Sequence, residues 1–128
     1  MASMIIGVGI DLIEVDRIGR SLEKFGERFL NKILCKEEIA YCQSHRNPAP
    51  FVAARFAAKE AISKAFGTGI GSELGWLDVE VSHHPSGQPF FILHPPAQIL
   101  LNKTGGTKVH LSISHTEKHA TAVAIIEG

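Results

Sequence analysis

The sequence is poor in the features that mark secreted and membrane proteins. It has only two cysteines in 128 residues, Cys35 and Cys42, and their C-x6-C spacing matches neither a zinc finger nor a redox CxxC motif. We therefore expect a reduced pair and a cytoplasmic protein, because thiols there rarely form disulfides. No run approaches the ~20 apolar residues of a membrane span. No basic segment precedes the first apolar run, so we predict neither a membrane partner nor a signal peptide.

Excess charge of one sign is also absent. Lys plus Arg and Asp plus Glu number 13 each, which argues against a nucleic-acid partner, since such proteins present basic surfaces. Apolar residues make up 45% and charged residues 20%, a composition typical of a globular chain. The length fits one domain, so we predict a single domain over residues 1–128. We interpret residues 1–3 as an artificial extension before a natural start at Met4.

The order of the expected elements indicates an α+β fold. The apolar run from Met4 to Leu12, broken by Gly7 and Gly9, predicts a buried strand that ends near Asp11, and glycines inside a strand indicate a bulge or the close approach of another backbone. Strands at both ends, with helices between them, are typical of a mainly antiparallel sheet packed against helices. The expected strands cover residues 4–11, 77–81, 90–93, 108–114 and 120–126, and the later helices cover 36–43, 51–66 and 96–103.

The first expected helix, which begins after Asp16, carries two stripes. Four apolar residues recur at steps of three and four and share one helical face: Ile18, Leu22, Phe25 and Phe29. Four basic residues form a neighbouring stripe, named here the basic ridge: Arg17, Arg20, Lys24 and Arg28. The ridge is either an ordinary solvated face or a docking surface that attracts an acidic partner by electrostatic steering.

The helix expected at 51–66 contains Glu60 four residues before Lys64. This order favours a plain surface ion pair worth about 0.2–0.5 kcal/mol. Alternatively, Glu60 offers oxygen ligands to a divalent cation such as Mg²⁺, and Lys64, one turn on, reaches a phosphate bound to the same cation. Asp11 is the candidate second carboxylate because it interrupts an apolar run, although a role at the strand end is the alternative. The glycines at 67, 69 and 71 predict a helix stop and a turn, not a phosphate loop, because phosphate loops precede a helix.

The segment HLSISHT, residues 110–116, ends a strand in serines and His115. His115 is either a phosphate contact or a hydrogen-bonded structural residue. The other histidines lack the HExxH or Cys/His spacings of metal sites, so no metal is assigned to them: His45, His83, His84, His94, His110 and His119.

Four blocks together resemble one family, the holo-acyl-carrier-protein synthases, which are small bacterial 4′-phosphopantetheinyl transferases. The blocks are GVGIDLIEVDRI at 7–18, RFAAKEAISKAFGTGIG at 55–71, SGQPF at 86–90 and HLSISHT at 110–116. The resemblance covers nearly the whole chain and implies the 4′-phosphopantetheinyl transferase fold. It also implies transfer of 4′-phosphopantetheine from coenzyme A to a serine of apo acyl carrier protein, leaving adenosine 3′,5′-bisphosphate, in support of fatty acid biosynthesis.

The resemblance further implies a catalytic group. Asp11 and Glu60 would bind Mg²⁺ together with the coenzyme A pyrophosphate, and Lys64 would contact that pyrophosphate and stabilise the leaving phosphate. The base that takes the serine proton stays open between Asp11 and Glu60 acting through water. The same group would also serve a hydrolase that splits the coenzyme A pyrophosphate, and a non-catalytic binding module is a third alternative.

The resemblance also implies substrate contacts and an assembly. Arg46, Arg55 and His115 would hold the nucleotide end of coenzyme A, and the basic ridge would meet the acidic helix of the carrier protein. The family is typically a homotrimer with an active site at each subunit boundary.

Overall fold

The computed structural model describes residues 3–128. Two residues of the extension predicted at 1–3, residues 1 and 2, lie outside the described residues. The elements follow one another as β1 (Ile5–Glu14), α1 (Val15–Phe25), α2 (Glu27–Ile33), α3 (Lys36–Gln43), α4 (Ala49–Phe66), the 3-10 turn η1 (Trp76–Asp78), β2 (Val79–His83), β3 (Pro89–Leu93), α5 (Pro95–Thr104), β4 (Lys108–His115) and β5 (His119–Glu127).

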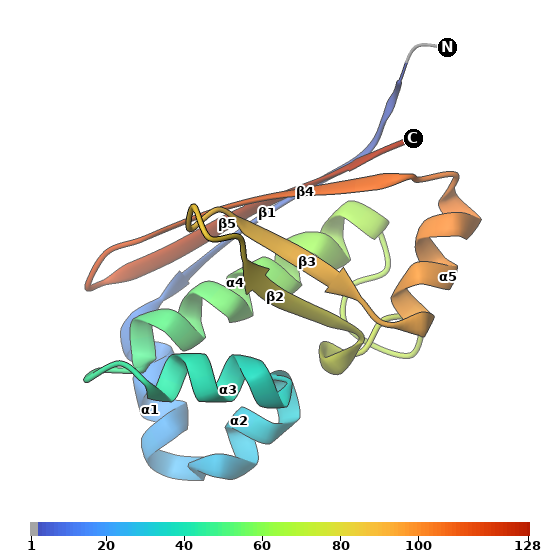
Figure 1. Ribbon diagram of the computed structural model, residues 1–128. Helices are drawn as coiled ribbons and strands as arrows, with labels where there is room; N and C mark the ends of the chain where they lie inside the picture. The colour runs from blue at the N-terminus through green and yellow to red at the C-terminus, as the bar shows by residue number, and fades with distance from the viewer. Residues whose placement is uncertain (1–2) are drawn as a thin grey trace.

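Helix α4 is the centre of the molecule. It packs under an antiparallel sheet of order β1-β5-β4, and the antiparallel β2–β3 hairpin lies across it. Figure 1 shows α1, α2 and α3 gathered at one end of α4 and α5 at the other. The predicted α+β fold with antiparallel strands packed on helices is therefore confirmed, and the predicted hairpin corresponds to β2 and β3.

Small residues let α4 and β1 touch along their length. A Cβ atom at Gly9 would overlap the carbonyl oxygen of Ala61, and one at Gly7 would overlap that of Ala65. The expected close approach of another backbone is therefore present, and the pairing of β1 with β5 also has an irregularity between Ile5 and Gly7. The helix ends at Gly67, whose φ of 79° is left-handed, a conformation that glycine adopts without steric cost.

The prediction that β1 is a buried strand is wrong for one of its two faces in the single chain. Gly9 and Ile13 face α4, whereas Val8, Ile10 and Leu12 on the other face are 59%, 60% and 67% exposed. Residues directly opposite on paired strands share a face, and Val8 and Ile10 lie opposite Ile125 and Val123 of β5. We name this apolar surface the outer sheet face: Val8, Ile10, Leu12, Val123 and Ile125.

The first helix is shorter than predicted. It ends at Phe25, and Gly26, with a φ of 55°, starts a separate helix α2. Phe29 and Arg28 therefore belong to α2, and the prediction of two stripes on one continuous helix is wrong. The physical reason is that a residue with positive φ breaks the right-handed path of the helix, and glycine reaches that φ cheaply.

A buried ion pair joins α3 to α4. Lys59, which is fully buried, donates from Nζ to Glu38 Oε1 at 2.7 Å, to the Ile33 carbonyl at 2.7 Å and to the Trp76 carbonyl at 2.9 Å. The other Glu38 oxygen accepts the Val81 N–H at 3.0 Å. The three N–H groups of the Lys59 ammonium thus have three acceptors, as a buried charge requires.

Two observations concern the helices and the thiols. Within residues 3–128 no helix is both long and apolar enough to cross a membrane. Cys35 and Cys42 are both free thiols, the first half-buried and the second buried in the core.

Candidate active site

Asp11, Glu60 and Lys64 line one open pocket of about 240 Å³ between β1 and α4. The Lys64 ammonium lies 3.1 Å from Asp11 Oδ1 and donates to the Ile10 carbonyl at 3.0 Å. Among the described residues the ion pair of Lys64 is thus with Asp11, on another element, and not with its helical neighbour Glu60. This departs from the plain helix-surface pair that the spacing alone favours.

The backbone contact between β1 and α4 brings the three side chains together. Alternate residues of a strand share a face, so Asp11 follows Gly7 and Gly9 toward the helix. Because Gly7 lies against the α4 backbone at Ala65 and Gly9 lies against it at Ala61, Asp11 is close enough to α4 for its carboxylate to contact Lys64. The glycines therefore take no part in the chemistry themselves, but they set how closely β1 approaches α4.

The pocket holds two carboxylates, and the pKa of Glu60 is shifted by its surroundings. Burial raises the pKa of Glu60, and the neighbouring Asp11 carboxylate raises it further, while Lys64 and Arg17 oppose the shift. Hard oxygen ligands beside partly neutralising cations suit a divalent ion such as Mg²⁺ that also binds phosphate. Arg17, which the sequence places on the basic ridge, lines this pocket instead of a separate surface.

Arg55 and His115 line a second pocket of about 160 Å³. Arg55 is only 3% exposed, and its guanidinium lies 4.3 Å from the centre of the Tyr41 ring. Its Nε lies 3.9 Å from Glu38, close enough for an ion pair but too far for a hydrogen bond. Nε has no hydrogen-bond partner in the described residues. A buried cation beside an open pocket suits an anionic ligand.

Aromatic rings form the walls of this second pocket. Tyr41 stacks on His83 with ring centres 5.1 Å apart, and Phe51 stacks on His45 at 3.5 Å. Phe51 also meets His115 edge to face. Flat rings beside a cation and a histidine suit a nucleobase with an attached phosphate. The sequence analysis missed Tyr41, Phe51 and His83, because they lie far apart in the chain and no spacing links them.

The two pockets are separate in one chain. They share no lining residue, and at about 100° per residue Arg55 points roughly 140° away from Glu60 around the α4 axis. Arg46 is exposed on the loop between α3 and α4 and lines neither pocket. The structure therefore brings together Asp11, Glu60 and Lys64, and separately Arg55 and His115, but does not join the two groups.

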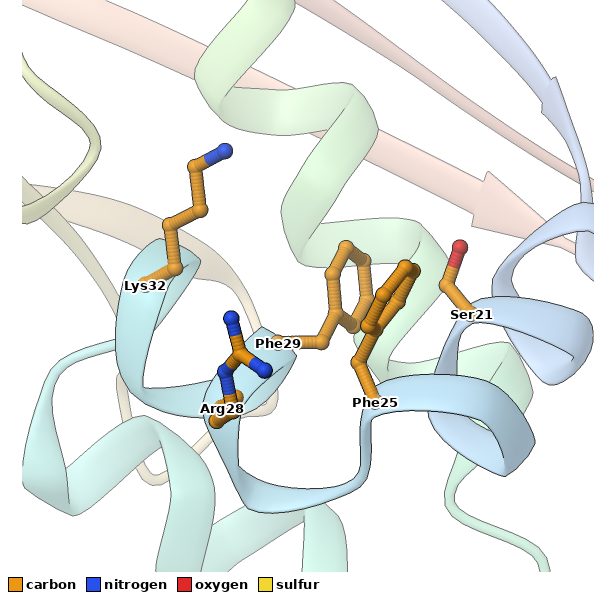
Figure 2. A pocket seen from close by; sticks show the side chains of 5 residues that line it. All are labelled: Ser21, Phe25, Arg28, Phe29 and Lys32. Carbon is orange, nitrogen blue, oxygen red and sulfur yellow. The ribbon is translucent and has the colours of Figure 1, made fainter.

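The remaining basic ridge is divided by the break at Gly26. Arg20 and Lys24 stay on α1, whereas Arg28 lies on α2 at a groove of about 330 Å³. Figure 2 shows the rings of Phe25 and Phe29 projecting into this groove, and its lining also includes Ser21, Arg28 and Lys32. The surface thus combines an apolar floor with cations, which suits an amphipathic acidic helix better than a uniformly charged ridge does.

Comparison with known proteins places the chain in a family. Residues 7–124 match the family model described as "ACPS: 4′-phosphopantetheinyl transferase superfamily". The holo-[acyl-carrier-protein] synthase of Koribacter versatilis is 48% identical over 97% of this chain and 99% of its own length.

Solved structures agree. The holo-[acyl-carrier-protein] synthase of Neisseria meningitidis superposes with a TM-score of 0.91 at 36% identity, covering 98% of this chain and 100% of its own. The Bacillus anthracis synthase in complex with CoA (3′,5′-ADP) superposes with a TM-score of 0.83 at 41% identity, covering 98% of both chains. The chain therefore belongs to the 4′-phosphopantetheinyl transferase superfamily, and within it to the holo-[acyl-carrier-protein] synthases.

Proposed function

We infer that this protein transfers 4′-phosphopantetheine from coenzyme A to a serine of an apo acyl carrier protein. The products are holo carrier protein, which supports fatty acid biosynthesis, and adenosine 3′,5′-bisphosphate. The observation that carries the inference is the carboxylate pair with its lysine, Asp11, Glu60 and Lys64, in one pocket of a chain with this family membership. In our proposal residues 1–128 act as one transferase domain, in the cytoplasm, where its free thiols stay reduced.

Asp11 and Glu60 would hold Mg²⁺ with the coenzyme A pyrophosphate. The bound ion supplies positive charge where negative charge develops on the phosphates. Lys64, half exposed and paired with Asp11, is free to turn toward the pyrophosphate and stabilise the leaving phosphate. The attacking serine belongs to the carrier protein, and its proton passes to a carboxylate of this pocket, directly to Asp11 or through water to Glu60.

Arg55 and His115 would hold the nucleotide end of coenzyme A in the second pocket. The unpartnered Arg55 Nε and the Tyr41 and Phe51 rings support this assignment, because a phosphate and a base would satisfy both the cation and the stacking surfaces. Arg46, on the exposed loop nearby in sequence, would add a further cation when the nucleotide binds.

A homotrimer would complete the site. The two pockets are separate in one chain, and the outer sheet face leaves Val8, Ile10 and Leu12 exposed beside the partly buried Val123 and Ile125, which is typical of a surface that binds a second copy. In a cyclic trimer the Glu60 pocket of one subunit would meet the His115 pocket of its neighbour at each boundary.

Subunit mixing tests this arrangement. Glu60→Gln and His115→Ala would each inactivate the enzyme, but random mixed trimers would regain about a quarter of wild-type activity, because one boundary in four has both intact residues. Ile10→Asp would also shift the sedimenting species from trimer to monomer, whereas Ile99→Asp, at an exposed site on α5, would not. Lack of any regain on mixing would place both pockets of a site in one chain.

The groove and the basic ridge would dock the acidic carrier protein. Reversing charge at Arg20 and Lys24 would raise KM for the carrier protein far more than KM for coenzyme A, because these cations steer the protein partner. An equal rise in both constants would contradict the assignment.

The activity itself is tested by mass spectrometry. Incubation with coenzyme A, Mg²⁺ and an apo carrier protein would add one phosphopantetheine mass to the carrier, and a chelator would abolish the addition. Release of free phosphopantetheine without a carrier would instead indicate a hydrolase. No reaction with several bacterial carriers would contradict the proposed activity.

A further inference from the structure

A third group of reactive side chains lies outside both pockets. Cys35 lies between α2 and α3, Glu80 lies in β2 and His94 precedes α5. One ligand atom from each of the three lies within 4.8 Å of the other two, and His94 Nε2 is 3.0 Å from Glu80 Oε1. Neither the cysteine spacing nor the histidine spacing predicts this cluster, because its members come from three separate segments.

We propose that Cys35, Glu80 and His94 bind one zinc-class divalent ion, with water in the fourth position. A thiolate and an imidazole favour Zn²⁺ over Mg²⁺, and one carboxylate is a common third ligand. Bond lengths of about 2.0–2.3 Å in a tetrahedral site put ligand atoms roughly 3.3–3.8 Å apart. Small side-chain rotations from the present separations are enough to reach that geometry.

The backbone already holds the three ligands in place. The buried carboxylate of Glu38 accepts the N–H of Cys35 at 2.9 Å and the N–H of Val81, the neighbour of Glu80, at 3.0 Å. The N–H of His94 is bound to a carbonyl of η1 at 2.9 Å. These main-chain hydrogen bonds fix the segments that carry the three ligands, so less freedom is lost when an ion binds.

The cluster is reachable from solvent. The His94 side chain is 39% exposed and that of Glu80 is 12% exposed, which leaves an entry path at the histidine. Burial raises the pKa of Cys35 to about 11, with Lys59 opposing and the Glu38 and Glu80 carboxylates adding to the rise. The free thiol is therefore protonated at neutral pH, and the ion takes the place of that proton when it binds.

Such an ion would act as a structural cross-link. It would tie the start of α3, strand β2 and the start of α5, which are distant in sequence. Helix α3 carries Tyr41 and β2 carries His83, both walls of the second pocket. Metal binding would therefore stiffen one side of that pocket without taking part in its chemistry.

Cobalt titration of chelator-treated, tag-free protein tests the site. One equivalent of Co²⁺ would produce a thiolate-to-cobalt charge-transfer band and tetrahedral visible bands, and Zn²⁺ would remove them while excess Mg²⁺ would not. Cys35→Ser would abolish the charge-transfer band, whereas the matched control Cys42→Ala would keep it. His94→Asn, in which asparagine suits the position at the start of α5, would weaken Co²⁺ binding by about 100-fold or more. Loss of a hydrogen-bond partner behind a metal ligand already costs about 10–100-fold in affinity, and His94 is itself a proposed ligand.

A second measurement separates this site from the Asp11 pocket. Zn²⁺ would raise the Tm of the wild type and of the Asp11→Asn/Glu60→Gln double variant equally, and would not raise that of Cys35→Ser. Absence of the band from the wild type, or its persistence in Cys35→Ser, would overturn the proposal and leave a hydrogen-bonded polar cluster. A Tm rise lost only in the double variant would also overturn it.

Discussion

Replacing Lys59 by methionine removes a buried cation while keeping most of the side-chain volume. In the native protein its ammonium donates to Glu38 and to the carbonyls of Ile33 and Trp76, at 2.7–2.9 Å. Methionine has no donor, so Lys59→Met leaves both carbonyls short of a partner and leaves Glu38 only the more distant cation of Arg55, whose Nε lies 3.9 Å away. The Glu38 carboxylate and the Ile33 carbonyl lie where water has little access, because both charged side chains and the bond to Ile33 are fully buried.

The expected loss follows from the energetics of buried pairs. Removing one partner of such a pair costs about 3–5 kcal/mol, because the other charge stays buried without compensation. Domains have about 5–15 kcal/mol of stability in total, so the loss is a large fraction of it. At about 3–5 °C per kcal/mol for a chain of this size, Tm would fall by ~10–20 °C.

Thermal and urea unfolding, followed by circular dichroism at one fixed protein concentration, measure the loss. The concentration must be fixed because assembly adds to apparent stability. Lys103→Met, at an exposed site in the last turn of α5, is the matched control and would change stability by no more than about 0.5 kcal/mol. A Lys59→Met protein within about 1 kcal/mol of the wild type would refute the reasoning from buried-pair energetics.

Three further predictions concern the contact between β1 and α4 and the two pockets. Gly9→Ala would destabilise the fold by about 1–3 kcal/mol or more, because its Cβ meets the Ala61 carbonyl; unchanged urea unfolding would contradict this. Glu60→Gln would be more stable than the wild type at neutral pH and equally stable in acid. Burial and the Asp11 carboxylate raise the pKa of Glu60, so the wild type loses folding free energy as pH rises through the raised pKa and Glu60 ionises. A wild type with the higher Tm at neutral pH would contradict this prediction. Tyr41→Leu, which removes the ring under the buried guanidinium, would raise KM for coenzyme A but leave KM for the carrier protein unchanged in steady-state assays.

Local chemistry predicted much of the fold because its signals lie within a few residues. The alternation of Val109, Leu111 and Ile113 with polar residues located β4, and glycine after the apolar run of α4 located its end at Gly67, where the structure has a left-handed φ. Glycines inside β1 predicted a close backbone contact, and Gly9 has one. Gly26 was the exception: one glycine ends α1, and nothing in the periodic pattern around it separates a tolerated helical glycine from a break.

The sequence by itself determined the identity of the family and the order of the elements apart from the break at Gly26, since motif blocks and short-range periodicity carry both. Only the tertiary structure decided which side chains meet. It paired Lys64 with Asp11 and not with Glu60. It also left one apolar face of β1 exposed, and it brought Cys35 close to Glu80 and His94 from other segments. The reason is physical: contacts between residues tens of positions apart depend on how helices and strands pack, and a spacing rule describes only one element at a time.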